Sequence, residues 1–425
     1  MAGQETMGAV IITVGDELLL GRTVDTNAAW LSRELAQLGI PVLRRYTVAD
    51  DEEEIRSALS ESLGRVRLLL LTGGLGPTPD DLTREVVARH LERPLHRDDE
   101  ILEDIRRRFR ERGVEELPEA NEKVALVPEG ARKLRNPHGT APGLVLESDG
   151  SLVVLLPGVP REMKGIFAGE LSELLKRRFQ GVLAPVYTRT IHTTGIPESV
   201  LAQEVAKRLP EPPEGIGLAF LPDLRGVDLR LTARGIDEAE AHALFRQVEE
   251  VLAPVVDPWR FEAPSGDLAE ALLEELRRRG WSLAVAESCT GGLVCTRLTN
   301  VPGASEVLLG GVVAYANEVK EKELGVDPEV LEANGAVSRE VAAAMATGVA
   351  ERLGAHCGIG ITGIAGPGGG TPERPVGTVW YAAAVKGDTV ARIERFPGDR
   401  TSVRERAAQA AMALLLRRCR EHTGP

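Results

Sequence analysis

The stretch VRLLLLTGGLGPTPDDLT, residues 66–83, decides the fold of the first half of the chain. Its apolar run is typical of a buried parallel strand, and its glycine-rich turn leads into a helix near 82–92. A strand at 9–14 (AVIITV) precedes a helix at 27–38 in the same way, and a strand at 152–156 (LVVLL) precedes PGVPREM and another helix. Strand, turn and helix in repetition predict a doubly wound α/β domain.

Polar loops follow these strands, at the ends where such sheets bind ligands. The glycines of residues 73–76 predict a loop of backbone N–H groups that accepts an anion. Asp81 and Asp16 supply oxygen ligands for a hard cation, and Glu162 is a further candidate. Carboxylates around a phosphate cradle indicate metal-assisted attack on a phosphoanhydride, although each aspartate alone is also a plausible helix cap.

The pattern changes between about residues 185 and 255, where strands and helices form a small α+β layer. Its element order resembles a KH-like module, but no G-x-x-G loop is present, so we assign no RNA binding to it. A spacer or dimerisation module is the simplest interpretation. Residues 253–266 carry three prolines and are predicted to form a linker.

A second α/β domain follows the linker. The residue pattern predicts helices at 267–279, 290–299, 338–353 and 401–418, and strands at 282–286, 311–315, 357–361, 376–384 and 389–396. The first of these strands ends in ESCTGG, residues 287–292, directly before a helix. Glycines permit a sharp turn there, and the free N–H groups of the following helix are expected to face it and to accept an oxyanion.

Ser288 stands at this turn, and the next strand leads to YANEVK, residues 315–320. A serine needs a base, and the domain offers His356 as its main histidine, so we favour a pair of Ser288 and Lys320 over a histidine triad. Lys320 must be neutral to act, and Tyr315 could relay or orient the proton. Helix capping by the serine is the structural alternative, and Cys289 is the rival nucleophile.

Two further segments suit a nucleotide. Residues 360–370 are too glycine-rich for a packed element, so their backbone can approach a flat ring and a ribose. Arg400 opens the final helix after Gly398 and Asp399, where a phosphate is favourable, although a surface cap explains one such arginine equally well.

The motifs ESCTGG, YANEVK, ITGIAGPGGG and GDR, in this order over about 120 residues, resemble the C-terminal domain of the competence/damage-inducible CinA family. That resemblance implies a nicotinamide mononucleotide deamidase, with Ser288 as nucleophile, Lys320 as base and Tyr315 as an assisting hydroxyl. It implies no metal at this site, and it implies substrate contacts at Thr290, Gly291, Gly292, Thr362, Gly363 and Arg400.

The first half resembles the molybdopterin-binding fold through its TGG-x-G-x-x-x-x-D-x-T motif. Its NPHGTAPG turn (136–143) and LPGVPREM turn look more like the N-terminal half of the CinA family. There the resemblance implies hydrolysis of ADP-ribose to AMP and ribose 5-phosphate with a divalent cation. The expected ligand contacts are Gly73, Gly74, Gly76, Asn136, Thr140 and Gly158, and the expected metal ligands are Asp16, Asp81 and Glu162.

We therefore expect three domains: residues 1–175 (molybdopterin-binding-like), 176–255 (KH-like) and 256–425 (deamidase). The expected function is bifunctional salvage of pyridine nucleotides. A molybdopterin-binding enzyme of molybdenum cofactor assembly and a non-enzymatic competence or recombination partner are the alternatives. A homodimer is expected, because the middle layer has a face to cover.

Composition narrows the choice of partners. The net charge of −13 over 425 residues argues against direct nucleic acid binding, which needs a basic surface. The four cysteines form no C-x-x-C pair, which argues against a zinc site or a disulfide framework. With no signal sequence and no apolar run of membrane-spanning length, the sequence favours a cytoplasmic protein.

Overall fold

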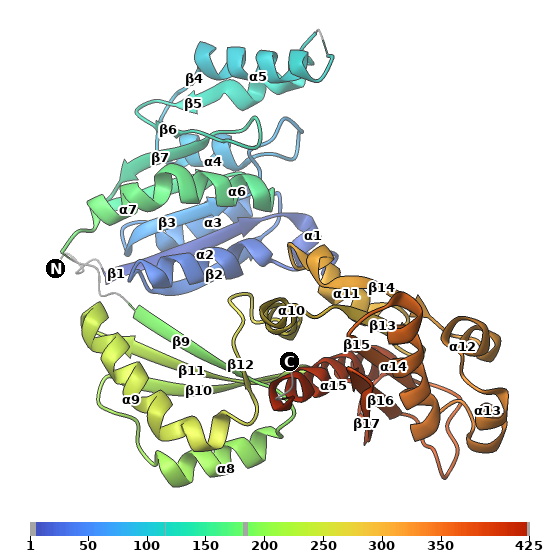
Figure 1. Cartoon of the computed structure of the whole chain (residues 1–425). Helices are drawn as coiled ribbons and strands as arrows, with labels where there is room; N and C mark the ends of the chain where they lie inside the picture. The colour runs from blue at the N-terminus through green and yellow to red at the C-terminus, as the bar shows by residue number, and fades with distance from the viewer. Residues whose placement is uncertain (1–5, 115, 182–185, 423–425) are drawn as a thin grey trace. The chain divides into compact units, whose positions relative to one another are not determined.

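The computed structural model describes residues 6–114, 116–181 and 186–422. The chain forms two compact units, one of residues 1–187 with 233–241 and one of residues 188–232 with 242–425 (Figure 1). Each sheet is described by itself, since β9, β11 and α9 each have residues in both units. Within the described ranges, no helix is long and apolar enough to span a membrane.

The first unit contains a six-stranded sheet in the order β2-β1-β3-β8-β7-β6. Strands β2, β1, β3 and β8 run parallel, whereas β7 and β6 are antiparallel additions at one edge. The doubly wound prediction is confirmed. The strands are β1 (Thr6–Val14), β2 (Val42–Val48), β3 (Val66–Thr72), β6 (Arg132–Leu134), β7 (Gly143–Ser148) and β8 (Ser151–Leu156), with a separate pair β4 (Leu95–Arg97) and β5 (Leu126–Pro128).

Separate apolar cores cover the two faces of this sheet because its strand residues alternate between them. Leu31 and Met163 belong to one core, and Ile55 and Val86 belong to the other. The helices are α1 (Asp16–Leu19), α2 (Thr26–Gln37), α3 (Glu52–Ser62), α4 (Thr83–His90), α5 (Asp99–Glu111), α6 (Pro160–Ile166) and α7 (Ser172–Arg178), with the 3-10 helix η1 (Glu119–Ala125) and the π-helix η2 (Phe167–Leu171).

The middle of the chain forms a four-stranded sheet in the order β10-β11-β9-β12. Its elements are β9 (Val186–Thr193), α8 (Glu198–Arg208), β10 (Ile216–Asp223), β11 (Gly226–Arg234), α9 (Glu238–Val256) and β12 (Arg260–Phe261). The linker predicted at 253–266 is therefore wrong in part. Helix α9 runs through Pro254 to Val256 because buried Leu252 and Val256 extend its apolar face, and β12 pairs with β9.

The C-terminal part forms a five-stranded sheet in the order β14-β13-β15-β16-β17, with β13 parallel to both of its neighbours. Its strands are β13 (Leu283–Glu287), β14 (Leu308–Val313), β15 (Cys357–Gly363), β16 (Thr378–Val385) and β17 (Asp388–Arg395). The helices are α10 (Leu268–Arg279), α11 (Leu293–Thr299), η3 (Ala304–Glu306), α12 (Asn317–Leu324), α13 (Pro328–Asn334), α14 (Arg339–Leu353) and α15 (Arg400–Glu421).

Helix α14 packs on this sheet with almost no side chain between the two backbones. A Cβ on Gly358 would lie 2.0 Å from the carbonyl oxygen of Ala346, and one on Gly360 would lie 2.3 Å from that of Ala342. On the helix itself, a Cβ on Gly348 would lie 1.8 Å from the carbonyl oxygen of Leu324, the last residue of α12. Glycine is therefore required at these three contacts for steric reasons.

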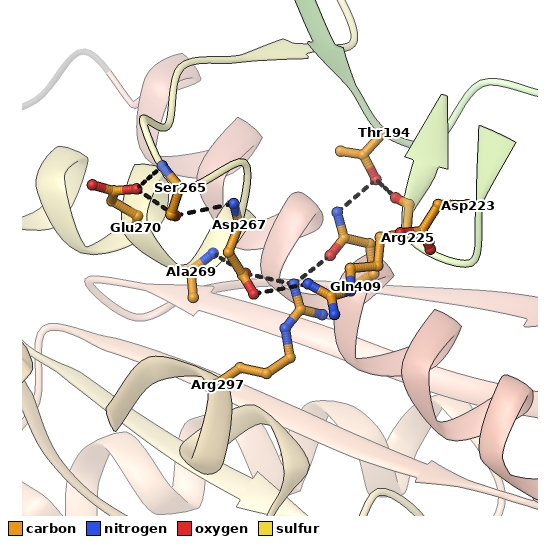
Figure 2. Close-up of polar contacts among 9 residues, drawn as sticks. All are labelled: Thr194, Asp223, Arg225, Ser265, Asp267, Ala269, Glu270, Arg297 and Gln409. Carbon is orange, nitrogen blue, oxygen red and sulfur yellow. Dashed lines mark hydrogen bonds and ion pairs between the residues drawn. The ribbon is translucent and has the colours of Figure 1, made fainter. Parts of the chain in front are cut away.

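A polar network joins the middle sheet to the helices of the C-terminal part (Figure 2). The buried guanidinium of Arg297 on α11 donates to Asp267 at 2.7 Å and to Gln409 at 2.7 Å. Gln409 in turn donates to the hydroxyl of Thr194 at 3.1 Å, and Arg225 pairs with Asp267 at 3.1 Å. Although burial would raise the pKa of Asp267, the hydrogen bond from Arg297 holds it below its ordinary value.

The close approach of α14 leads to a stability prediction. Gly360→Ala forces the helix off the strand, so it should lower the free energy of unfolding by about 2 kcal/mol. Gly217→Ala, on β10, is the matched control, because its nearest neighbour would be 3.8 Å away and the change should cost no more than about 0.5 kcal/mol. Denaturant titration of both variants measures the difference, and equal stabilities would contradict the close-packing argument.

Candidate functional site

The carboxyl ends of β13, β14 and β15 meet at one edge of the C-terminal sheet. The amide of Ser288 donates to the carbonyl of Ile361 on β15 at 2.9 Å. On the other side, the amide of Ala314 donates to the carbonyl of Glu287 at 2.8 Å. The turn that carries Ser288 is therefore held between the ends of both neighbouring strands, as expected for a ligand-binding edge of a parallel sheet.

The carboxylate of Glu287 is buried and binds the start of α11. It accepts hydrogen bonds from the amides of Gly292 at 3.0 Å, Val294 at 3.1 Å and Cys295 at 3.0 Å. The sequence predicts free amides for an oxyanion at the start of this helix and predicts that the helix begins at residue 290. Both points are wrong, because Glu287 already satisfies the amides and α11 begins only at Leu293, after Gly292 with φ +92°.

Lys320 lies on α12 with its side chain 1% exposed, although lysine is almost never fully buried. Its Nζ donates to the carbonyls of Ala314 at 2.8 Å and Tyr315 at 3.2 Å, directly after β14. Burial lowers the pKa of Lys320, and the nearby Cys289 and Glu318 oppose this effect only in part. The amine therefore loses its proton more readily than an ordinary lysine does.

The partners of the Lys320 amine lie on the strand end beside the Ser288 turn. Ala314, whose carbonyl binds Nζ, pairs with Glu287, the residue before Ser288, and adjacent strands lie about 4.8 Å apart. Cys289, the residue after Ser288, influences the pKa of Lys320. Among the residues that the structure describes, no hydrogen bond joins Ser288 to Lys320, and such catalytic bonds commonly tighten only when substrate is bound.

Cys289, the rival nucleophile, is buried, and burial raises the pKa of its thiol to about 12. Because the thiolate is the reactive form of cysteine, Cys289 is protonated and inert at neutral pH. Ser288 at the same turn is buried to a similar degree, so the distinction rests on the thiol, whose reactive thiolate form is disfavoured by burial. The environment therefore favours the serine over the cysteine.

Arg400 and Tyr315 meet beside the glycine-rich loop after β15. Arg400 donates to the hydroxyl of Tyr315 at 3.0 Å and to the carbonyl of Gly366 at 2.7 Å. Arg404, one turn along α15, donates to the carbonyl of Thr290 at 2.7 Å. Tyr315 is 61% exposed, so its hydroxyl contacts Arg400 from the open side of the site. Its role as an assisting hydroxyl stays a prediction.

The other expected substrate contacts at this edge differ in whether their hydrogen-bonding groups are already used within the protein. The hydroxyl of Thr362 donates to the carbonyl of Ala336 at 2.7 Å, which ties β15 to the loop before α14. The hydroxyl of Thr290 is buried without a hydrogen-bond partner among the described residues. Gly291 (φ +61°) and Gly292 form the turn, and a Cβ on Gly363 would lie 2.8 Å from the carbonyl of Thr378. The fold therefore favours glycine at each of these three positions, whether or not the residue contacts a substrate.

In the first unit, the glycines after β3 pack closely against the ends of its two neighbouring strands. A Cβ on Gly73 would lie 2.2 Å from the carbonyl oxygen of Val14 on β1, and one on Gly158, after β8, would lie 3.2 Å from Cα of Gly73. Gly76 faces the carboxylate of Asp81, where a Cβ would lie 2.5 Å from Oδ2. Arg84, buried on α4, donates to the carbonyl of Leu75 at 2.7 Å and so fixes the loop, a role that the sequence did not reveal.

The turn at residues 136–143 is organised by the side chain of Asn136. Its Nδ2 donates to the carbonyl of Ala141 at 2.8 Å and to the carboxylate of Glu162 at 2.7 Å. Its Oδ1 accepts from the amides of His138 and Gly139, each at 2.9 Å. All four hydrogen-bonding positions of Asn136 are thus used within the protein. Thr140, in the same turn, is half-buried.

The expected metal ligands lie in separate surroundings. Asp81 accepts from the amide of Thr78 at 2.8 Å, Glu162 binds Asn136, and the amide of Asp16 donates to Asp50 at 3.0 Å. Over the described part of the chain, no group of three or more His, Cys, Asp or Glu side chains is arranged to hold a metal ion. The metal site stays a prediction.

Asp50, which follows β2, is an acidic residue of this edge that sequence reasoning missed. Burial raises its pKa, a hydrogen bond from the amide of Asp16 opposes this, and the charges of Asp16, Glu17 and Asp80 raise it further. Carboxylates from the loops after β1, β2 and β3 therefore repel one another at the same edge of the sheet. The sequence analysis did not predict β2. Had it done so, Asp50 would have been recognised as an acidic residue just after a strand end.

Three family models match successive stretches of the chain. A probable molybdopterin binding domain covers residues 10–177, the damage-inducible protein CinA KH domain covers residues 188–259, and the CinA C-terminal domain covers residues 265–419. The resemblances drawn from the motifs, and the KH-like order of the middle elements, are thereby confirmed.

Two relatives are similar to this chain over nearly its whole length and over nearly their own. A CinA-like protein of Gemmatimonas aurantiaca is 48% identical over 97% of this chain and 96% of its own length. A putative competence-damage inducible protein of Caldicellulosiruptor saccharolyticus is 41% identical over 96% of this chain and 98% of its own. A crystal structure of the protein CinA from Thermoplasma acidophilum, described as of unknown function, is 38% identical and covers 40% of this chain and 99% of its own, with a TM-score of 0.38. The chain belongs to the CinA family.

Proposed function

We propose that the C-terminal part of the chain is an amidase that converts nicotinamide mononucleotide and water to nicotinate mononucleotide and ammonia. The observation that carries this proposal is the buried Lys320 amine, with its pKa lowered, beside the turn that presents Ser288. A neutral lysine next to an otherwise unactivated serine is the arrangement that serine–lysine amidases need. The family motifs supply the choice of substrate.

The contacts of Lys320 suit a proton acceptor. A neutral amine has two N–H bonds, and the carbonyls of Ala314 and Tyr315 accept two hydrogen bonds from Nζ. The lone pair then points away from both carbonyls and can accept the hydroxyl proton of Ser288 as Oγ attacks the carboxamide carbon. Lys320 returns the proton to the departing nitrogen, which leaves as ammonia, and water then hydrolyses the acyl ester on Ser288.

Arg400 is proposed to bind the phosphate of the substrate. Its guanidinium lies at the first turn of the 22-residue helix α15, so the charge of the side chain and the helix dipole act together. The hydrogen bond to Tyr315 and that to Gly366 hold it in place before substrate binds. Arg404 holds the carbonyl of Thr290, which orients the Ser288 turn relative to the same helix.

The nucleophile is tested by release of ammonia from nicotinamide mononucleotide, measured with EDTA present. Ser288→Ala should lower kcat by about a thousandfold or more, because no other group forms the acyl intermediate. Cys289→Ala is the matched control, and it should keep the rate within about threefold because the thiol is protonated. Loss of activity in the cysteine variant together with survival in the serine variant would reverse the assignment.

The base is tested by the pH dependence of kcat/KM. The neutral form of Lys320 is the active one, so the rate should rise with pH as the amine loses its proton. Because burial lowers the pKa, this rise should be centred below the ordinary lysine value of 10.5. Lys320→Met should remove both the activity and the rise. A rise centred at the ordinary lysine value would show that Lys320 is not the base.

We further propose that the first unit hydrolyses ADP-ribose to AMP and ribose 5-phosphate with a divalent cation. The supporting observation is Asp50, whose pKa is raised first by burial and further by the charges of Asp16, Glu17 and Asp80, an effect that a divalent cation would relieve. Asp16 and Asp50 would hold it, since magnesium is commonly bound by one or two carboxylates together with substrate phosphates. When bound, the ion would polarise a phosphoryl oxygen, while amides of residues 74–76 would donate hydrogen bonds to the diphosphate.

This second activity is tested by AMP formation from ADP-ribose with added magnesium or manganese. Asp50→Asn should lower the rate at least about tenfold, since it removes one negative charge from the cation site. It should leave ammonia release unchanged. Asp149→Asn, in the β7–β8 turn with φ +48°, is the control and should alter neither activity. If instead the chain binds a pterin and forms no AMP, the molybdopterin-binding alternative replaces this proposal.

A further inference from the structure

A second cavity, separate from the Ser288 turn, lies where the middle sheet meets the C-terminal sheet. Its volume is about 590 Å³, within the range of small-molecule sites, which often occur at such junctions. The turn after β9 and the β10–β11 turn form one wall, and β17 and helix α15 form the other. Trp259, in the connection between α9 and β12, completes the lining.

The cavity carries an excess of positive charge in a chain whose net charge is −13. Five arginines line it against three carboxylates, and the arginines are Arg225, Arg392, Arg395, Arg406 and Arg417. Only Arg225 among them forms an ion pair within the described ranges. The uncompensated guanidinium groups indicate that the cavity is built for an anion.

Two arginines on α15 strengthen this interpretation. The Nε of Arg406 is buried, and no described residue accepts a hydrogen bond from it. A buried donor without an acceptor costs free energy, which an anionic oxygen would recover. The guanidinium of Arg417 lies over the ring of Trp259, 5.9 Å from its centroid. An aromatic face beside guanidinium groups suits a ligand that carries a flat ring as well as phosphate.

The walls of the cavity are held in place before any ligand binds. Thr194, Arg225 and Gln409 line it and also belong to the network around the buried Arg297 (Figure 2). Thr194 donates to the carbonyl of Arg225 at 2.8 Å and accepts from Gln409, so the middle sheet and α15 are tied together at the cavity floor. Preorganised walls reduce the ordering cost of binding.

From these observations we infer that the cavity between the β10–β11 turn, β17 and α15 is a binding site for a phosphorylated small molecule of nucleotide size. This site differs from the amidase turn and from the loops of the first unit, and it does not depend on the function proposed for either. Arg392 and Arg406 bind the phosphate, and Trp259 contacts the remainder of the ligand.

Binding is measured by calorimetry on the full-length chain, with AMP and, separately, inorganic pyrophosphate. Arg392→Gln/Arg406→Gln should weaken binding at this site at least about tenfold. Arg352→Gln, an exposed arginine on α14 that pairs with Glu323, is the matched control and should bind like the wild type. If AMP binds and pyrophosphate does not, the site requires the ring of the nucleotide as well as its phosphate. If both bind, the site recognises phosphate alone.

Tryptophan fluorescence separates this cavity from other anion sites in the chain. The AMP-dependent change should be present in the wild type and absent in Trp259→Phe. Because Arg392 is exposed on β17, the single variant Arg392→Gln should fold normally and should still weaken binding. If AMP produces no saturable change that depends on Trp259, or if that change survives unchanged in the arginine double variant, the cavity is not an anion site and the inference is overturned.

Discussion

The buried carboxylate of Glu287 is the interaction on which the C-terminal site depends. It ends β13, satisfies three amides at the start of α11 and thereby sets the turn that carries Ser288. A buried amide without an acceptor would cost roughly 1–3 kcal/mol, so these hydrogen bonds stabilise the observed conformation of the turn. The glycines at 291 and 292 permit that conformation, and the neighbouring strands hold it from both sides.

Burial has opposite consequences for the pKa values of Lys320 and of Cys289, the residue after Ser288. It lowers the pKa of Lys320, which makes the amine available as a base, and it raises the pKa of Cys289, which silences the thiol. In the proposed mechanism, burial thus favours the lysine as a base and disfavours the thiol as a nucleophile. Such opposed shifts are typical of functional sites, where pKa values are set by environment more than by residue type.

Sequence reasoning predicted the elements whose signal is local. The apolar strands β3, β8 and β13, the glycine turns and the convergence of the motifs around residues 288 and 320 follow from pattern and topology. The start of α11 does not, because it depends on which amides the Glu287 side chain binds. The C-terminal end of α9 and the surroundings of Asp50 do not follow either, because they depend on burial and on charges from other segments. The hydroxyl of Thr362 is a similar case, since its partner, the carbonyl of Ala336, lies 26 residues away.

The glycines between α14 and its neighbours have a consequence for mutational tolerance. Gly348 on α14 contacts α12, the helix of Lys320, and Gly358 and Gly360 contact α14 from β15, the strand that pairs with β13. A saturation scan scored by activity should find larger side chains poorly tolerated at all three positions, although none of them is proposed to contact a substrate. In this fold, intolerance to substitution therefore does not by itself identify a catalytic residue, because the contacts between α14 and its neighbours are intolerant as well. A separate assay of folding distinguishes the two cases.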